Sequence, residues 1–295
     1  YQFAVKDVHH FDITAGYDGY SYQYTELTGS GQNLYDPESF YISNTIDKKT
    51  ASGMKLTYAT EGFFGRVNYS YDDKYFGNVS YRRDASSRFA PENRWGDFWA
   101  ASVAWMITRE DFMKDITWIN MLKLKASFGQ QGNDDILFAG GYTVGGTSKN
   151  YYPWMDQYNM TGADGVFSDG TMIAKGNRDL TWETSTSYPD ITLLPKKKTY
   201  NVGIDLALFN NRLNGSAEYF GRKSSDMLYN KPVAGSVGYT SIPMNVGSMT
   251  NSGFELDLTY LIFNQKNFTW DVNLNATFIK NKINKLHPDL DGQLI

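Results

Sequence analysis

Residues 63–107 read FFGRVNYSYDDKYFGNVSYRRDASSRFAPENRWGDFWAASVAWMI, and apolar side chains recur at every second position through most of this segment. Polar residues such as Arg66, Asn68 and Ser70 occupy the positions between them. Successive side chains of a strand point to opposite faces of a sheet, so this period predicts three strands. Their apolar face comprises Gly65, Val67, Tyr69 and Tyr71, then Tyr75, Gly77, Val79 and Tyr81, then Trp99, Ala101, Val103, Trp105 and Ile107.

The length of these runs and the placement of their aromatic residues go beyond an ordinary strand. Each run is about ten residues long, which is enough to cross a bilayer at a tilt. Tyr and Trp stand near the run ends, and these side chains favour the headgroup level of a membrane. We therefore predict an all-β fold, a transmembrane antiparallel up-and-down β-barrel with its apolar face toward lipid. A soluble β-sandwich with one solvated face is the alternative at this point.

The lengths of the connections favour the barrel. Short turns are predicted at residues 72–74, 210–211 and 264–267, with residues 108–120 as an intermediate member that allows a short helix. Long polar loops are predicted at residues 25–55, 85–96, 130–198 and 221–251, and they alternate with the short set along the chain. Outer-membrane barrels have short turns on one side and long loops on the other, whereas a sandwich does not sort its loops in this way.

Composition narrows the function classes. The chain has 295 residues, no cysteine and a net charge of −4, which argues against thiol chemistry, cysteine-bound metals and a nucleic-acid surface. It holds 22 Tyr and 27 Gly, which suit aromatic belts and tight turns. Apolar runs of roughly eighteen residues are absent, so no transmembrane helix is expected. About nine strong strands and a partial one at Tyr1 indicate part of a larger barrel, and both chain ends are read as cuts in a longer protein.

Several segments together resemble the SusC/RagA family of TonB-dependent outer-membrane transporters. They occur in collinear order over most of the chain: residues 63–105, LKLKASFGQQGNDDI at 122–136, NRDLTWETSTSY at 177–188, YNVGIDLALFNNRLNGSAEYFGRKSSDML at 200–228, GYTSIPMNVGSMTNSGFELDL at 238–258 and FTWDVNLNATFIKNKI at 268–283. One departure is PDITLLPKKKT at residues 189–199, where the family passes more directly from the WET segment into YNVG.

The resemblance implies more than the residue pattern does. SusC-like proteins are large barrels with an N-terminal plug, capped by a SusD-like surface lipoprotein and driven by the TonB complex of the inner membrane. They import oligosaccharides or, in some members, peptides. The whole chain, residues 1–295, would then be part of the barrel domain in the outer membrane of a Gram-negative bacterium. The plug and the TonB-contacting peptide are expected upstream of Tyr1.

Two sets of side chains are candidates for function. Aromatic residues in the longest predicted loop could stack on sugar rings or pin the loop against its neighbours, and they are Tyr151, Tyr152, Trp154, Tyr158 and Trp182. Cationic residues on the polar face or near one strand end could contact a plug or an anionic ligand, or simply line a solvated wall. These are Arg66, Arg82, Arg83, Arg88, Arg94 and Lys125.

Catalysis and metal binding are not expected. His9 and His10 are adjacent and would face opposite sides of a strand, and His287 is distant from them. Residues 133–135, Asn-Asp-Asp, lack the spaced carboxylates of a calcium loop and favour a turn. The glycine pairs at 140–141 and 145–146 lack the Lys-Ser/Thr of a phosphate loop. No enzyme activity, cofactor or metal is predicted.

We therefore predict an importer of large nutrients. Oligosaccharides are the preferred cargo and peptides are the alternative, and outer-membrane lipid is expected around the barrel. The alternative from another class is a secreted or surface-attached β-rich module that binds glycans or mediates adhesion. Within the membrane class, a passive porin is the second alternative. The residues do not identify the sugar.

Overall fold

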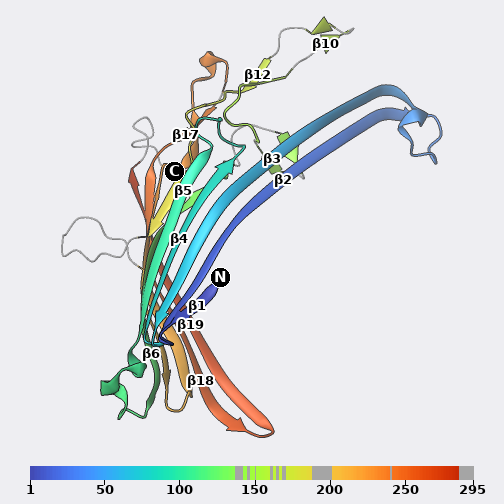
Figure 1. The fold of residues 1–295 in the computed structure, drawn as a ribbon. Coiled ribbons are helices and arrows are strands. Elements are labelled where there is room, and N and C mark those ends of the chain that lie inside the picture. The colour runs from blue at the N-terminus through green and yellow to red at the C-terminus, as the bar shows by residue number, and fades with distance from the viewer. Residues whose placement is uncertain are drawn as a thin grey trace.

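One curved antiparallel sheet of eleven strands forms the body of the molecule (Figure 1). The computed structural model describes residues 1–136, 142–144, 147–149, 151–159, 162–163, 166–167, 171–187, 201–239 and 241–285. The two glycine pairs, His287 and the departure at residues 189–199 lie outside these ranges. β1 and β19 each pair on one side only, so the described sheet is an open part of a barrel wall.

The sheet strands follow one another in space nearly in chain order. They are β1 (Gln2–Val5), β2 (His9–Leu34), β3 (Thr45–Tyr71), β4 (Tyr75–Ser86), β5 (Trp95–Met106), β6 (Ile119–Asn133), β13 (Glu183–Ser187), β14 (Asn201–Leu208), β15 (Leu213–Ser225), β18 (Ser248–Gln265) and β19 (Phe268–Lys285). Both β13 and β14 lie between β6 and β15 and pair with them. β14 pairs with one part of these two strands, and β13 pairs with another part. The predicted up-and-down order is confirmed.

In the described ranges, four small hairpins lie at the end of the sheet that carries the long connections. They pair β7 (Tyr142–Val144) with β8 (Thr147–Lys149), β9 (Gln157–Asn159) with β12 (Thr171–Ala174), β10 (Gly162–Ala163) with β11 (Val166–Phe167), and β16 (Leu228–Pro232) with β17 (Ser241–Asn245). The described helices are single 3₁₀ turns: η1 (Ile42–Asn44), η2 (Ile107–Arg109), η3 (Asp111–Met113) and η4 (Gly235–Val237). A helix able to cross a membrane does not occur in the described ranges.

The predicted tight turns form where the residues allow a left-handed backbone. Asp72 and Asp73 have φ of 50° and 51°, and Asn210 and Asn211 have φ of 57° and 60°. Consecutive left-handed residues twist a two-residue turn in the sense that matches the flanking strands, and Asn and Asp tolerate this conformation. The short connections gather at the lower end of Figure 1 and the long ones at the upper end, which confirms the predicted sorting.

An apolar row crosses every strand of the sheet except β13. It comprises Phe3, Phe11, Tyr69, Gly77, Val103, Ala126, Val202, Tyr219, Phe254 and Phe278. Val103 is 63% exposed and Phe278 is 68% exposed. Within the described residues the only other sheets are two-stranded hairpins, so no second sheet covers this face. The sandwich alternative is therefore wrong, and the exposed apolar face meets lipid.

Aromatic residues border this apolar face at two levels. At the short-turn end, the Tyr75 ring lies 6.2 Å from Tyr71 and 6.4 Å from Trp105. Farther up, Phe63 lies 5.0 Å from Tyr17 and 6.3 Å from Trp95. The eight residue steps from Phe63 to Tyr71 span roughly 26 Å along β3, or about 20 Å across a membrane at a typical strand tilt. This height approximates the apolar band of an outer-membrane barrel.

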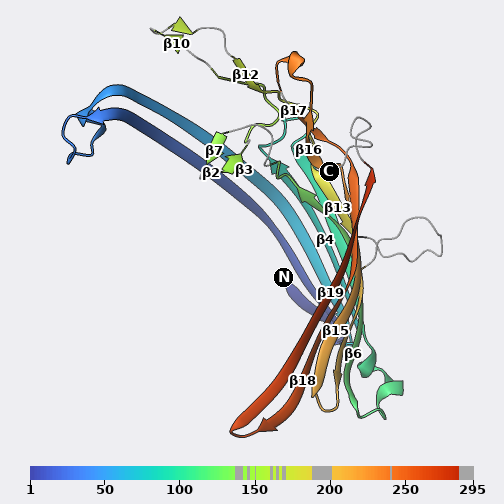
Figure 2. The ribbon, with the colours of Figure 1, turned by 180° about the vertical axis from the view of Figure 1, so that it is seen from behind.

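The predicted loop at residues 25–55 is wrong, because β2 and β3 remain paired as far as Leu34 and Thr45. The true connection is residues 35–44, and the two strands arch well beyond the rest of the sheet (Figures 1 and 2). We call the part of this hairpin between Tyr20 and Thr60 the arm. Most arm residues are exposed, so neither face needs apolar side chains and the period-two signal fades although the backbone pairing continues.

Where residues 108–120 allow a short helix, the structure has the 3₁₀ turns η2, which starts at Ile107, and η3. Two other predicted connections contain more strand than expected. The predicted loop at 130–198 contains β13, which joins the main sheet. The predicted loop at 221–251 is shortened by the extension of β15 to Ser225 and the start of β18 at Ser248. Polar strand ends give no alternation of hydropathy, which is why these extensions were missed.

The outward apolar face yields a stability prediction. Val79 lies midway between the two aromatic levels and is 59% exposed. Val79→Arg places a cation against hydrocarbon and should destabilise the full-length barrel by about 2–4 kcal/mol. Ser102→Arg puts the same charge on the polar face of the neighbouring strand and should cost less than about 1 kcal/mol. Urea titration of both variants in lipid vesicles measures this difference, and equal destabilisation would contradict the assignment of faces.

Candidate functional site at the long-loop end

A small core forms at the base of the long connections. Phe89 and Leu180 are fully buried and Ile136 is 4% exposed, with Trp182 and Leu228 packed against them. The Trp182 ring lies 5.4 Å from Phe89, and its Nε1 donates a hydrogen bond of 2.9 Å to a backbone carbonyl. These residues come from four separate segments, so the core ties the long loops into one folded layer above the barrel wall.

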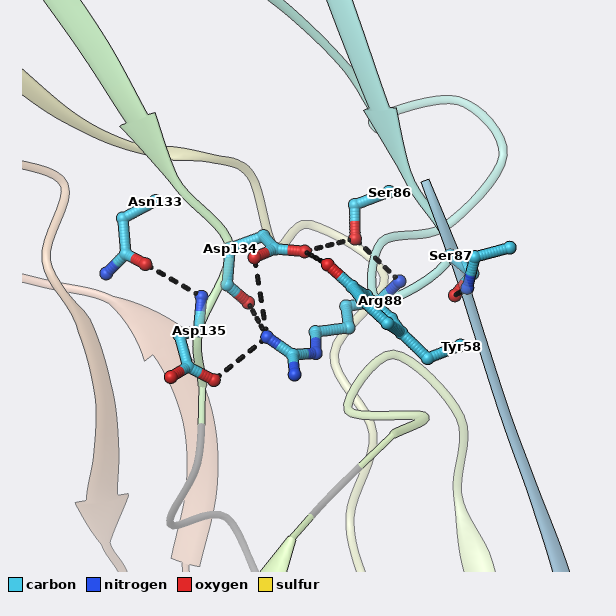
Figure 3. Close-up of polar contacts among 8 residues, drawn as sticks. Tyr58, Ser86, Ser87, Arg88, Asn133, Asp134 and Asp135 are labelled. Atoms are coloured by element: carbon cyan, nitrogen blue, oxygen red, sulfur yellow. Dashed lines mark hydrogen bonds and ion pairs between the residues drawn. The ribbon is translucent and has the colours of Figure 1, made fainter. Parts of the chain in front are cut away.

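Asp134 organises a polar network beside this core (Figure 3). Its carboxylate accepts hydrogen bonds from Tyr58 Oη at 2.8 Å and Ser86 Oγ at 2.5 Å. Arg88 Nη1 lies 3.4 Å from Asp134 Oδ1 and 2.9 Å from Asp135 Oδ1, and its guanidinium stands 4.5 Å from the centre of the Tyr58 ring. The network therefore joins the base of the arm, the end of β4 and the segment that follows β6.

The electrostatics of this network indicate a structural role, and we call its residues Tyr58, Ser86, Arg88, Asp134 and Asp135 the clasp. Burial and the neighbouring Asp134 carboxylate raise the pKa of the Tyr58 phenol, so its hydroxyl stays protonated and donates. Arg88 pairs with both Asp134 and Asp135. Within the described ranges, no three acidic or histidine side chains gather as a metal site. Asp134 and Asp135 thus lie in an ion-paired turn that holds loops together.

Two of the five predicted aromatic residues meet at the base of the arm. Tyr151 is buried and lies between Tyr22, at 6.3 Å, and Tyr58, at 6.4 Å. Tyr152 Oη accepts from the Thr57 backbone N–H at 3.1 Å. These contacts place the long loop against the arm.

The other predicted aromatic residues lie elsewhere. Trp154 Nε1 donates to the Ser87 carbonyl at 3.3 Å, and the Arg178 guanidinium stands 5.4 Å from the Trp154 ring centre. Trp182 belongs to the buried core described above, whereas Tyr158 is 48% exposed on β9. Loop packing accounts for the positions of Tyr151, Tyr152 and Trp182. A role of the five residues in substrate binding stays a prediction.

The predicted cations occupy different environments. Lys125 pairs with Asp205 at 2.9 Å and with Glu218, and Arg82 pairs with Asp18 at 2.7 Å and Asp84 at 2.6 Å. Arg66 is exposed on the same polar face, and Arg83 lies 3.8 Å from Asp97 at the other face. The backbone carbonyl of Arg94 accepts a hydrogen bond from Trp182, and the Nε atom of Arg94 is buried. Contact of Arg66, Arg82, Arg88, Arg94 and Lys125 with a plug stays a prediction.

Sequence reasoning missed a cavity of about 810 Å³ on the polar face of the sheet. Its lining includes Asn78, Ser102, Ser127, Asn201, Phe220 and Asn251, from six strands. The period-two alternation of residues 213–220 places Phe220 opposite Tyr219, on the polar face. Only the pairing register shows which side chains of the neighbouring strands surround its ring.

Comparison with known proteins supports the assignment of the sheet. Residues 1–294 match the model of a family described as TonB dependent receptor-like, beta-barrel. The chain belongs to this family. It therefore lies in the outer membrane of a Gram-negative bacterium, with its apolar face toward lipid and its polar face toward the barrel lumen.

Similar proteins confirm the resemblance to SusC. TonB-dependent receptor P39 of Formosa agariphila is 30% identical over 271 residues, which cover 92% of this chain and 24% of that protein. TonB-dependent receptor SusC of Bacteroides thetaiotaomicron is 30% identical over 263 residues, covering 88% and 24%. A solved structure of the RagAB peptide transporter shares the fold, with a TM-score of 0.83, 24% identity, and coverage of 97% and 29%. The chain spans about a quarter of the length of these proteins.

The Asp134 network can be tested by its effect on the loops. Asp134→Ala leaves Arg88, which is 13% exposed, without its central partner and removes the acceptor of Tyr58 and Ser86. Breaking a largely buried ion pair costs about 3 kcal/mol. We expect faster proteolytic cleavage of the full-length protein within residues 134–182, while the barrel itself stays folded.

A matched control is the exposed pair between Glu92 and Arg178 in the same loop layer, in which the two side chains are 49% and 60% exposed. Glu92→Ala should change the cleavage rate little, because exposed ion pairs contribute about 0–1 kcal/mol. Equal cleavage of Asp134→Ala, Glu92→Ala and the unaltered protein would show that the network does not hold the loops.

Proposed function

We propose that this chain forms part of the wall of a TonB-dependent importer that carries oligosaccharides across the outer membrane. The observation that carries this proposal is the division of one barrel sheet into a lipid-facing apolar side and a polar side, in a chain of the TonB-dependent receptor family. Energy from the TonB complex would be used to open the lumen. The polar face would line the route of the substrate.

Oligosaccharides are the favoured cargo because of the chemistry of the lumen face. The cavity there is lined by hydroxyl and amide side chains together with three charged groups and apolar residues that include Phe128, Phe220, Met249 and Ile279. Hydroxyl and amide groups exchange hydrogen bonds with neutral hydroxyls without requiring charge on the ligand. Similarity to the receptor named SusC agrees with this choice.

We further propose that a SusD-like lipoprotein covers the long-loop end. The arm projects well beyond the rest of the sheet (Figure 2). The small core holds together the loops at the same end. These elements offer a preformed rim on which a surface protein can seat. We propose transport without covalent chemistry, and TonB contact through a part of the protein beyond this chain.

Import of peptides is the second candidate function. It is supported by the fold shared with the RagAB peptide transporter. Backbone amides of a peptide would also find partners among the amide and hydroxyl groups of the lumen face. The two candidates predict different growth phenotypes.

Deletion of the full-length gene in the host bacterium tests these alternatives. We expect loss of growth on one oligosaccharide as sole carbon source, with unchanged growth on its constituent monosaccharides, because small sugars pass through porins. Complementation with the full-length gene should restore growth only when TonB is functional. Retained growth on every oligosaccharide with lost growth on peptides would favour the second candidate, and TonB-independent restoration would indicate a passive porin.

A further inference from the structure

One row of the lumen face changes from polar to apolar as it crosses the sheet. Asn78, Ser102, Ser127 and Asn201 precede Phe220 in this row, and Gly253 and Ile279 follow it. All of these except Gly253 line the cavity of about 810 Å³. The half-buried Phe220 therefore stands at the border between the hydroxyl and amide side chains of this row and its apolar end.

The glycine beside Phe220 fixes how its ring lies. A Cβ atom on Gly253 would stand 2.6 Å from Phe220 Cζ, a distance that no real contact reaches. The ring therefore lies across the bare backbone of β18, a cross-strand pairing in which an aromatic side chain covers a glycine. One side of the ring packs against the backbone of β18, and the ring borders the cavity.

Polar groups lie on both sides of the ring along the strands. Glu218 and Glu255 are two residues from Phe220 and Gly253 in one direction, and Arg222 and Asn251 are two residues away in the other. Two residues correspond to roughly 6.6 Å along a strand, which is comparable with the width of a sugar ring. A sugar stacked on Phe220 would thus have a carboxylate at one edge and a guanidinium and an amide at the other.

The partners of these polar groups differ. Glu218 is paired with Lys125, and Arg222 donates to the Gln131 amide oxygen. Asn251 Oδ1 is buried and accepts no hydrogen bond within the described part of the chain. Because this oxygen is closed to solvent, Asn251 meets the cavity through its other atoms.

We propose that Phe220 is a stacking platform for one sugar ring of the transported oligosaccharide, with Asn251, Arg222 and Glu255 binding its hydroxyls. This site rests on the proposed function and deepens it, because it places the cargo on the lumen wall. The apolar faces of a sugar ring match the flat ring of Phe220. Its hydroxyls project from the edges, where the carboxylates of Glu218 and Glu255 lie on one side and the guanidinium of Arg222 lies on the other.

Phe64 provides a matched control on the same face. A Cβ atom on Gly16 would stand 2.5 Å from Phe64 Cζ, so this ring also covers a cross-strand glycine. The guanidinium of Arg82, itself paired with Asp18 and Asp84, stands 5.7 Å from the Phe64 ring centre. Phe64 is not among the residues that line the cavity. Its substitution removes an equivalent ring from the wall but not from the proposed site.

The test uses the full-length protein in detergent and isothermal titration with maltoheptaose, laminarihexaose, xylohexaose and a tryptic peptide pool of casein. For whichever oligosaccharide binds the unaltered protein, Phe220→Ala should raise the dissociation constant about tenfold, as loss of an aromatic contact does. Phe220→Leu keeps apolar volume over Gly253 but loses the flat ring, and it should show the same loss. Phe220→Tyr and Phe64→Ala should stay within about twofold of the unaltered protein. Heat-modifiable migration on gels checks that each variant is folded.

The outcomes separate this site from the proposed function. Oligosaccharide binding that is unchanged in both Phe220→Ala and Phe220→Leu would overturn the platform and leave the proposed function intact. An equal loss in Phe64→Ala would also overturn it, because the effect would then belong to the wall in general. If no oligosaccharide binds the unaltered protein, whether or not the peptide pool binds, both the platform and the proposed function are overturned.

Discussion

The need to satisfy every backbone amide and carbonyl within lipid governs this structure. Hydrocarbon offers no hydrogen-bond partners, so each strand must take all of its partners from its two neighbours. That requirement fixes the antiparallel ladder from β1 to β19 and leaves the side chains free to divide between the two faces. The apolar row from Phe3 to Phe278 and the polar row beside it both follow from this ladder.

The parts of the fold that could be predicted from the sequence are those that local residue patterns determine. The alternation around Val67 and Val79 indicates which side chains meet lipid, because a period of two is intrinsic to an extended backbone. Turn chemistry at Asp72–Asp73 and Asn210–Asn211 marks the strand ends, because these residues tolerate a positive φ. Beyond Tyr24 the arm was missed, because strand residues that are solvated on both faces give no alternation of hydropathy.

The candidate site was less accessible to sequence reasoning, because its contacts are long-range. Tyr58 and Asp134 are 76 residues apart, and Tyr152 meets Thr57 across 95 residues. The register of β15 against β14 and β18 decides whether Phe220 stands beside Asn201 and Gly253. A shift of one residue would turn Phe220 toward lipid and Tyr219 toward the lumen. Aromatic content alone could therefore identify a loop rich in rings but could not identify the ring that faces the cavity.

The clasp at Tyr58 has a mechanical consequence for the arm. Tyr151 and Asp134 support the hairpin at Tyr22 and Tyr58, but from there to Leu34 it continues for twelve residues, or roughly 40 Å. A beam fixed at one end deflects in proportion to the cube of its free length. Moving the support by a few residues would therefore change the deflection of the tip far more than the length of the arm. The position of Asp134 thus determines how stiff the arm is.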